Sequence, residues 1–268
     1  MKNIKKYMFA TKLTAWVFIF FISANNANGN IIQSADSAYL ADDYALAASL
    51  YLKAEKEQGT SSSLYYNIGN AYYRSGEIGK AILYYKRALK LDPTNRDARQ
   101  NLKFALTKTV DKQEDNHTSF IQKVSDSILF SNTPNGWAVT ALLVFVIFLS
   151  ATAVYVFSSS VIIKKICFFG GLVVLVIDCI LIYMACKSAS IVSDHSSAVV
   201  ISPNVQLSTV PRIPKDKSEQ AFQLHEGTVV EIVDSVKLNS DTIPSMWLEV
   251  KLDNVHRAWI NSKDVERL

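Results

Sequence analysis

The most informative part of this chain is residues 64–93, which read LYYNIGNAYYRSGEIGKAILYYKRALKLDP. Gly69 and Ala81 are small residues placed where two helices of a hairpin would approach closely, and aromatic residues flank both of them. Pro93 follows the second half, and proline cannot continue a helix and restricts the residue before it. The stretch therefore predicts two packed helices that end before Pro93.

Working outward, part of this pattern recurs at a fixed spacing. Ala47, Tyr51 and Ala54 are repeated 34 residues later as Ala81, Tyr85 and Ala88. This period and pattern resemble the tetratricopeptide repeat. Residues 28–61 read as a weaker first copy, and Asp97–Lys108 as an amphipathic capping helix. We therefore expect an all-α tetratricopeptide-repeat domain with a capping helix over residues 28–108.

Repeats of this kind bind peptides or partner helices in a concave groove and do no chemistry themselves. The polar residues Asn67, Asn70 and Arg74 could bind a peptide backbone or a carboxylate. The alternative is an ordinary solvated helix surface. The candidate partner-binding residues are Tyr66, Asn67, Asn70, Tyr73 and Arg74.

The N-terminus has the order of a signal peptide: lysines, then a short apolar run, then small residues. We expect a signal peptide over residues 1–27, with cleavage after Ala24 or Ala27. An uncleaved membrane anchor is the alternative.

Two apolar runs follow the repeat region, at residues 137–157 and 166–186. Each is long enough to cross a bilayer as a helix. The intervening residues 158–165 are too few for a domain, so the runs predict a two-helix transmembrane hairpin; a hairpin buried in a soluble core is the alternative. The linker contains Lys164 and Lys165, which favours a cytoplasmic position for it.

This topology predicts an inner-membrane protein whose two larger domains are periplasmic. Residues 109–136 form a polar linker before the first span, and helical spacing of its apolar residues indicates an interfacial helix. Those residues are Phe120, Val124, Ile128 and Leu129.

Asp178 lies near the centre of the second predicted span. An ionisable group at that depth is costly and needs a partner. The favoured interpretation is an assembly contact with Thr140, Thr152 or a partner's helix. A proton or ion relay is the alternative, although a relay usually needs several polar groups and this hairpin has one acid.

After a linker at residues 187–197, the pattern changes to short alternating runs. Five or six short strands within residues 198–268 predict a small all-β barrel. The runs at residues 222–230 and 247–251 and the ending at residues 258–261 resemble bacterial SH3 domains, although Ala258 replaces the usual glycine before Trp259. Trp247 and Trp259 are candidates for a binding surface, and a place in the core is the alternative for at least one.

Composition excludes several classes of protein. Four of the 28 lysines and arginines lie in the first twelve residues, and the other 24 equal the 24 acidic residues, which argues against a nucleic-acid binder. The three cysteines lie between residues 167 and 186, and the four histidines are dispersed. No disulfide framework, metal site, cofactor or catalytic motif is expected, and the protein is expected not to be an enzyme.

The order of signal, repeats, membrane hairpin and SH3-like barrel resembles the BatE family of proteins from the aerotolerance (Bat) operons of Bacteroidetes. The resemblance implies a scaffold in an envelope complex linked to aerotolerance or stress, with von Willebrand type A membrane proteins of the same operon as partners. The family offers no catalytic residues to transfer. A barrel that binds peptidoglycan or senses the cell wall is the alternative function.

Overall fold

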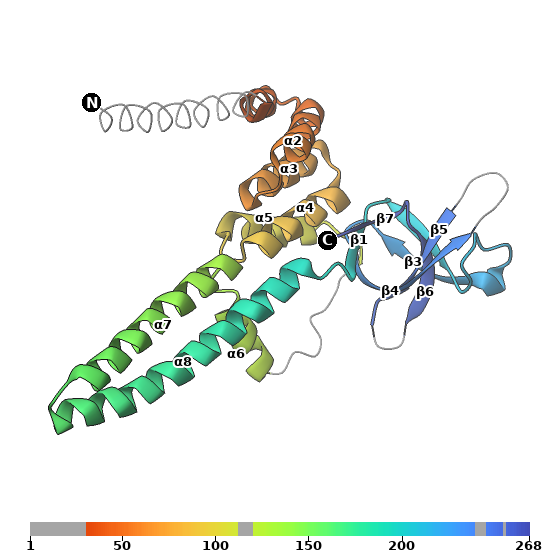
Figure 1. Ribbon diagram of the computed structural model, residues 1–268. Coiled ribbons are helices and arrows are strands. Elements are labelled where there is room, and N and C mark those ends of the chain that lie inside the picture. Colours follow the sequence, from red (N-terminus) through yellow and green to blue (C-terminus); the bar gives the residue numbers. More distant parts are fainter. Residues whose placement is uncertain (1–30, 112–119, 239–244, 254–255) are drawn as a thin grey trace, which may run out of the picture.

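The structure is a computed structural model that describes residues 31–111, 120–238, 245–253 and 256–268. The predicted signal peptide, residues 1–27, lies outside the described residues. The described chain has three parts, which are a stack of short helices, a long helical hairpin and a β domain (Figure 1). The predicted multidomain fold class is confirmed.

The N-terminal part is a stack of antiparallel helices (Figure 1). A helix over residues 31–40 is followed by α2 (Tyr44–Gln58), α3 (Ser62–Ser75), α4 (Ile78–Leu91) and α5 (Arg96–Leu106). The hydroxyl of Ser61 accepts from the Leu64 amide and caps the start of α3, whereas Gly76 ends that helix in a left-handed conformation with φ of 87°. These local signals give the short turns that let consecutive helices fold back on each other.

The predicted close approach of the paired helices is present between α3 and α4. A Cβ atom added at Gly69 would lie 2.7 Å from the Tyr85 ring, so no larger residue fits there without a shift. Ile68, Ala81 and Ile82 are fully buried around this contact. The small residues therefore let an aromatic ring pack directly against the neighbouring helix backbone.

The middle of the chain forms the helical hairpin. Helix α6 (Phe120–Leu129) leads into α7 (Pro134–Phe157), which packs along α8 (Val161–Ser193) (Figure 1). Both α7 and α8 are long and apolar enough to cross a membrane, and most of their large apolar side chains are exposed. Helix α8 is longer than the predicted span of residues 166–186 at both of its ends.

The C-terminal part is an antiparallel sheet of seven strands in the order β3-β2-β6-β5-β4-β1-β7. Alternate side chains form its core, which includes Val200, Leu207, Val250 and Ile260. The five or six strands expected from the sequence did not include β3, although most of β3 lies in the run at residues 222–230 that resembles SH3 domains. The strands are β1 (Ser197–Val200), β2 (Asn204–Ser208), β3 (Gln220–His225), β4 (Val229–Leu238), β5 (Ser245–Lys251), β6 (Arg257–Asn261) and β7 (Val265–Arg267).

The β domain packs directly on the helical stack rather than hanging from the hairpin alone. Val199 of β1 belongs to the same buried apolar cluster as the repeat helices, and Val229 and Leu268 pack against that cluster. The two domains expected as separate modules therefore share part of one core.

Candidate functional site

The five candidate groove residues all lie on α3, and Asn70 is the most constrained of them. Its Oδ1 accepts hydrogen bonds from the Tyr85 hydroxyl at 2.7 Å and from the Asn101 amide at 2.8 Å. Because these donors come from α4 and α5, Asn70 ties three helices together. Burial raises the pKa of Tyr85, so its phenol stays protonated and able to donate.

Tyr66 and Tyr73 are half-buried and pack against the repeat core. The Tyr66 hydroxyl lies 3.5 Å from the Asn101 amide nitrogen, at the limit of a hydrogen bond. Both rings are therefore held by the core and expose only part of their apolar surface on the α3 face.

Asn67 and Arg74 are the polar groups that α3 offers to a partner. Among the described residues, the Asn67 side chain forms no hydrogen bond, and it is half-buried. Arg74 is 55% exposed, lies over the Tyr44 ring at 4.8 Å and pairs with Asp42 at 3.7 Å. An exposed pair of this kind is weak, so a partner carboxylate could replace Asp42 at little cost.

The opposite side of the repeat is closed by the β domain. Glu226, in the turn after β3, accepts a hydrogen bond from the Gly79 amide of α4 at 2.8 Å. A Cβ atom at Gly79 would lie 2.9 Å from the Val200 carbonyl oxygen, so the backbones of the two domains are in direct contact. These contacts use α4, the second helix of the hairpin, and leave the α3 face to other partners.

Ion pairs extend this interface along α4. The Arg87 guanidinium pairs with Glu266 at 2.8 Å and donates to the Arg267 carbonyl, while its plane lies over the Tyr84 ring at 5.0 Å. Arg87 is 17% exposed, which reduces solvent screening of the pair. Arg87 therefore holds the last strand of the β domain to α4 through two acceptors on neighbouring residues.

Asp111, which follows the capping helix α5, forms a second set of polar contacts between the repeat region and the β domain. Its carboxylate accepts from the His225 amide at 2.7 Å, from His225 Nδ1 at 2.9 Å and from the Thr228 hydroxyl at 2.7 Å. Partial burial acts to raise the pKa of Asp111, but the hydrogen bonds from Thr228 and His225 outweigh it and hold that pKa below its usual value. The folded state therefore prefers the ionised carboxylate.

Reasoning from the sequence missed this interface. The partners of Asp111 lie 114 and 117 residues away, and those of Arg87 lie about 180 residues away. The sequence indicates a turn at His225, Glu226 and Gly227, but it does not indicate which part of the chain this turn contacts. A single sequence has no pattern that links such distant positions.

The two tryptophans of the β domain lie in different environments. Trp247 is 5% exposed, and Trp259 is half-buried on the neighbouring strand. Only Trp259 therefore has ring surface to offer a ligand, and Trp247 fits the core alternative.

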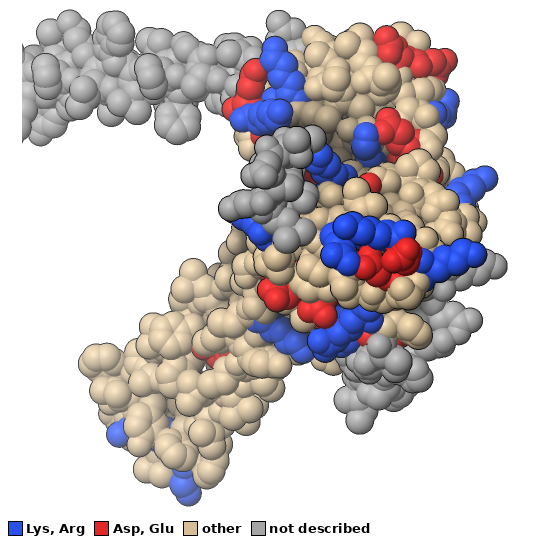
Figure 2. All heavy atoms as spheres, turned by 90° about the vertical axis from the view of Figure 1, so that its right-hand side faces the viewer, with Lys and Arg blue, Asp and Glu red and all other residues tan. Residues whose placement is uncertain are grey.

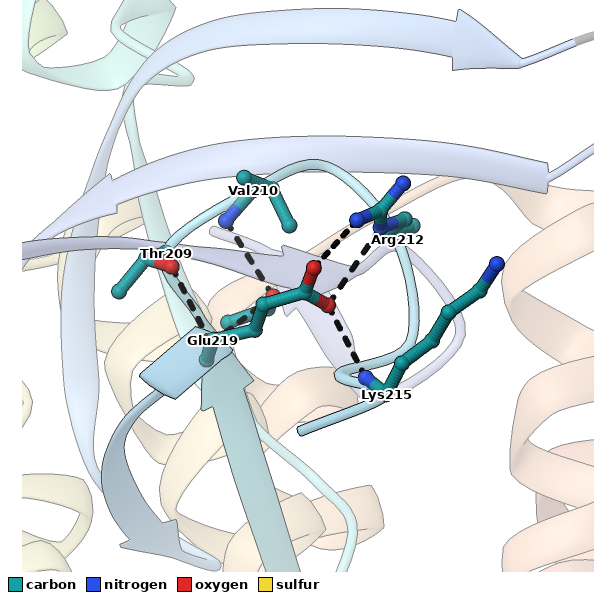
Figure 3. A network of polar contacts seen from close by, with 6 residues as sticks. Thr209, Val210, Arg212, Lys215 and Glu219 are labelled. Atoms are coloured by element: carbon teal, nitrogen blue, oxygen red, sulfur yellow. Dashed lines mark hydrogen bonds and ion pairs between the residues drawn. The ribbon is translucent and has the colours of Figure 1, made fainter. Parts of the chain in front are cut away.

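The loop between β2 and β3 is built around Glu219 (Figure 3). Its carboxylate accepts from the Arg212 guanidinium and from the Lys215 amide at 3.0 Å, and its carbonyl accepts from the Thr209 amide at 2.8 Å. Hydrogen bonds from Arg212 and Lys215 hold the pKa of Glu219 below its usual value. These bonds give the long loop a defined shape.

Asp178 is 3% exposed, and its Oδ1 has no hydrogen-bond partner among the described residues. It lies seven residues after Gly171, which faces Phe148 of α7, so both residues are on the side of α8 that meets α7. The Thr140 and Thr152 hydroxyls, suggested by the sequence as partners, donate to carbonyls of their own helix.

Among the described residues, no group of three or more His, Cys, Asp or Glu side chains is arranged to hold a metal ion.

Comparison with known proteins matches one segment of the chain. Residues 62–95 match the family described as Tetratricopeptide repeat, and these residues comprise α3, α4 and the turn that follows. No curated protein matches the chain. The helical part of this protein therefore contains a tetratricopeptide repeat.

Proposed function

We propose that this protein is a non-enzymatic scaffold of the inner membrane, whose periplasmic repeat region and β domain bind partner proteins in an envelope complex. The observation that carries the proposal is the tetratricopeptide repeat at residues 62–95. Repeats of this family present their first helices to partners. In this chain the β domain covers the second helix, α4, so the arrangement leaves α3 for that role.

The hairpin supports a place in the membrane. Helices α7 and α8 are almost free of charge along their exposed surface, and cations lie at the tip (Figure 2). Lys164 and Lys165 belong to the first turns of α8 at that tip. The positive-inside rule puts such a tip in the cytoplasm, and the repeat region and β domain on the opposite side.

The shared core of the repeat region and β domain sharpens the proposal. A partner that touches both would meet them in a fixed geometry, because Gly79 and Arg87 hold them together. No entropy is then lost in ordering a flexible linker on binding. We propose von Willebrand type A membrane proteins of the same operon as these partners and a role in aerotolerance or envelope stress, as the resemblance to the BatE family implies.

The test is affinity purification of the tagged full-length protein in mild detergent, with partners identified by mass spectrometry. The groove variant is Asn67→Ala with Arg74→Ala, which removes the two available polar groups. Asn70 is left intact because it holds three helices together. The matched control is Lys53→Ala with Lys56→Ala on the exposed side of α2.

We expect a von Willebrand type A membrane protein to co-purify with the parent and the control, and at least tenfold less of it with the groove variant. Equal recovery from the groove variant would exclude α3 as the docking face. Recovery of no membrane protein by the parent would contradict the scaffold.

The second candidate is a cell-wall-binding function, favoured by the half-buried Trp259 ring on β6. The strand order, in which β7 returns beside β1, supports an SH3-like domain, and such domains bind cell-wall material in other proteins. Retention on purified sacculi that falls at least fivefold on Trp259→Ala would favour this function. Retention that is absent, or unchanged by the substitution, would exclude it.

A further inference from the structure

A cavity of about 460 Å³ lies where the repeat region, the hairpin and the β domain meet. One wall comes from α4 and α5, and the facing wall comes from Phe130, which precedes α7, and from the last turns of α8. This volume is within the usual range for small-molecule sites. The cavity therefore sits at the end of the hairpin from which both helices emerge into the larger domains.

The depth of this cavity matches the headgroup layer of a membrane. Ile191 lies five residues beyond Cys186, the end of the apolar span, which is about 7 Å at the helical rise of 1.5 Å per residue. The headgroup layer on each side of a bilayer is about 5–8 Å thick. Trp137, at the start of α7, and Lys187 mark the same boundary, where aromatic and basic residues gather.

The walls combine apolar and cationic groups. Leu89, Leu102, Phe130 and Ile191 supply apolar surface. Because Phe130 and Ile191 belong to segments that enter and leave the membrane, this surface continues onto the outside of the hairpin.

Three cationic side chains, those of Lys86, Lys90 and Arg99, and one acidic side chain, that of Asp194, line the cavity. The Asp194 carboxylate already accepts from the Ser196 amide at 2.8 Å. Among the side chains that line the cavity, cations therefore outnumber anions.

The arrangement of two of these cations favours an anion. The Arg99 guanidinium has five N–H donors and gives one to the Pro93 carbonyl. The Lys90 ammonium donates to the backbone oxygens of Asp194 and, at 3.1 Å, of Leu268. Burial lowers the pKa of Lys90, and the nearby Asp194 carboxylate offsets this effect only in part, so a further anion would stabilise the ammonium.

We propose that this cavity binds an anionic phospholipid, with the phosphate held by Lys86, Lys90 and Arg99 and an acyl chain running past Phe130 and Ile191 into the bilayer. The inference rests on the membrane placement of the proposed function. A membrane lipid fits better than a free phosphate compound, because only a ligand with a hydrocarbon chain would pack against the apolar wall. The lipid would fix the height and tilt of the repeat region above the membrane.

The test is native mass spectrometry of the full-length protein in mild detergent, titrated with phosphatidylglycerol or phosphatidylcholine. The pocket variant is Lys86→Gln with Arg99→Gln. The control is Lys56→Gln with Lys103→Gln, which removes the same charge from exposed positions outside the cavity. We expect one phosphatidylglycerol per chain, at least tenfold tighter than phosphatidylcholine, with tenfold weaker binding in the pocket variant and none of this loss in the control.

Equal binding of the two lipids, full binding by the pocket variant, or an equal loss in both variants would overturn the proposal. Competition by soluble glycerol phosphate at similar concentration would assign the site to a free phosphate and also overturn it. A diazirine placed on the acyl chain adds a second readout, which should label the peptides that contain Phe130 or Ile191.

Carbonate extraction of membranes separates this proposal from the one on which it rests. Protein that resists extraction but does not select phosphatidylglycerol contradicts the lipid site alone. Protein released by carbonate contradicts the membrane placement and the lipid site together.

Discussion

The interface between the repeat region and the β domain differs in kind from the interface inside the helical hairpin. In the first, Gly79, Arg87 and Asp111 each have a specific polar partner on the β domain. In the second, the contact is apolar, and its one buried acid, Asp178, has an oxygen without a partner among the described residues. The first interface depends on specific polar contacts between named residues. The second depends only on apolar packing between two helices, which an apolar surrounding such as a membrane would allow.

This difference predicts which single substitutions should lower the stability of the protein. Changes at the interface between domains should separate two modules that otherwise move as one. In the membrane that we propose for the hairpin, changes that keep it apolar should be tolerated, because a lipid tail is as apolar as the packing partner.

The largest effect is expected for Gly79→Val. A Cβ atom at this position meets the Val200 carbonyl oxygen at 2.9 Å, and backbone cannot move aside as a flexible side chain can. We expect a loss of about 2–3 kcal/mol, typical of overpacking, seen as a lower urea midpoint in mild detergent.

Gly170→Val on the hairpin is the matched control for this prediction, because nothing lies within 4 Å of a Cβ atom there. We expect it to change the midpoint little. Similar losses in the two variants would contradict the contrast between the interfaces.

Asp111→Ala should have the next largest effect. It removes acceptors for three hydrogen bonds from His225 and Thr228, and we expect a loss of about 2 kcal/mol after allowing for partial exposure. Limited proteolysis should also cut faster between the repeat region and the β domain.

The same carboxylate predicts a pH dependence. Because the pKa of Asp111 is lower in the folded state than its ordinary 3.8, its stabilisation is complete above about pH 4 and is lost as the pH falls through the folded value. The difference in stability between the parent and Asp111→Ala should therefore shrink in acid. A difference that stays constant from pH 6 to pH 3 would show that ionisation of Asp111 does not contribute.

Arg87→Ala should cost about 1 kcal/mol, since Arg87 is only 17% exposed, although Glu266 is 41% exposed, and since Arg87 also donates to the Arg267 carbonyl. The comparison is Lys53→Ala, which breaks an exposed pair with Glu57 on α2. We expect less than about 0.5 kcal/mol for that pair. Equal midpoints for the two variants would mean that the interface pair is as weak as a surface pair.

The smallest effect is expected for Asp178→Asn. Since no partner satisfies Asp178 Oδ1 among the described residues, a neutral amide of similar shape should leave the midpoint unchanged or raise it by up to about 1 kcal/mol. Insertion into membranes should also be unchanged. A clear loss of stability, or of a co-purified membrane protein, would instead reveal a partner for this carboxyl group.

The repeat and the hairpin could be predicted from the sequence because their signals are local. Gly69, Tyr85 and Pro93 lie within one 34-residue unit, and each hairpin helix is a continuous apolar run. The alternating strands of the β domain are also local signals, and β3 was not counted as a strand although Phe222 and Leu224 alternate with polar residues in the run that resembles SH3 domains.

The arrangement of the domains could not be predicted, because it depends on pairs such as Arg87 with Glu266 that are far apart in the chain. The groove was predicted as a set of polar and aromatic residues on one helix, which are Tyr66, Asn67, Asn70, Tyr73 and Arg74. The structure shows that Tyr85 and Asn101 already donate hydrogen bonds to Asn70. Among the described residues, the Asn67 side chain forms no hydrogen bond, and Arg74 forms an exposed ion pair with Asp42. Local periodicity places a side chain on a helix face, but only the neighbouring helices decide whether it is already used.

We propose that partners dock on α3, and the β domain contacts α4 on the other side of the repeat. The most direct test is photo-crosslinking in living cells, with a crosslinking amino acid at position 67 on α3 or at position 53 on α2, which is exposed and outside the groove. We predict that position 67 captures the same membrane protein that affinity purification recovers, and that position 53 does not. Capture of that protein equally from both positions, or from position 53 alone, would contradict the account.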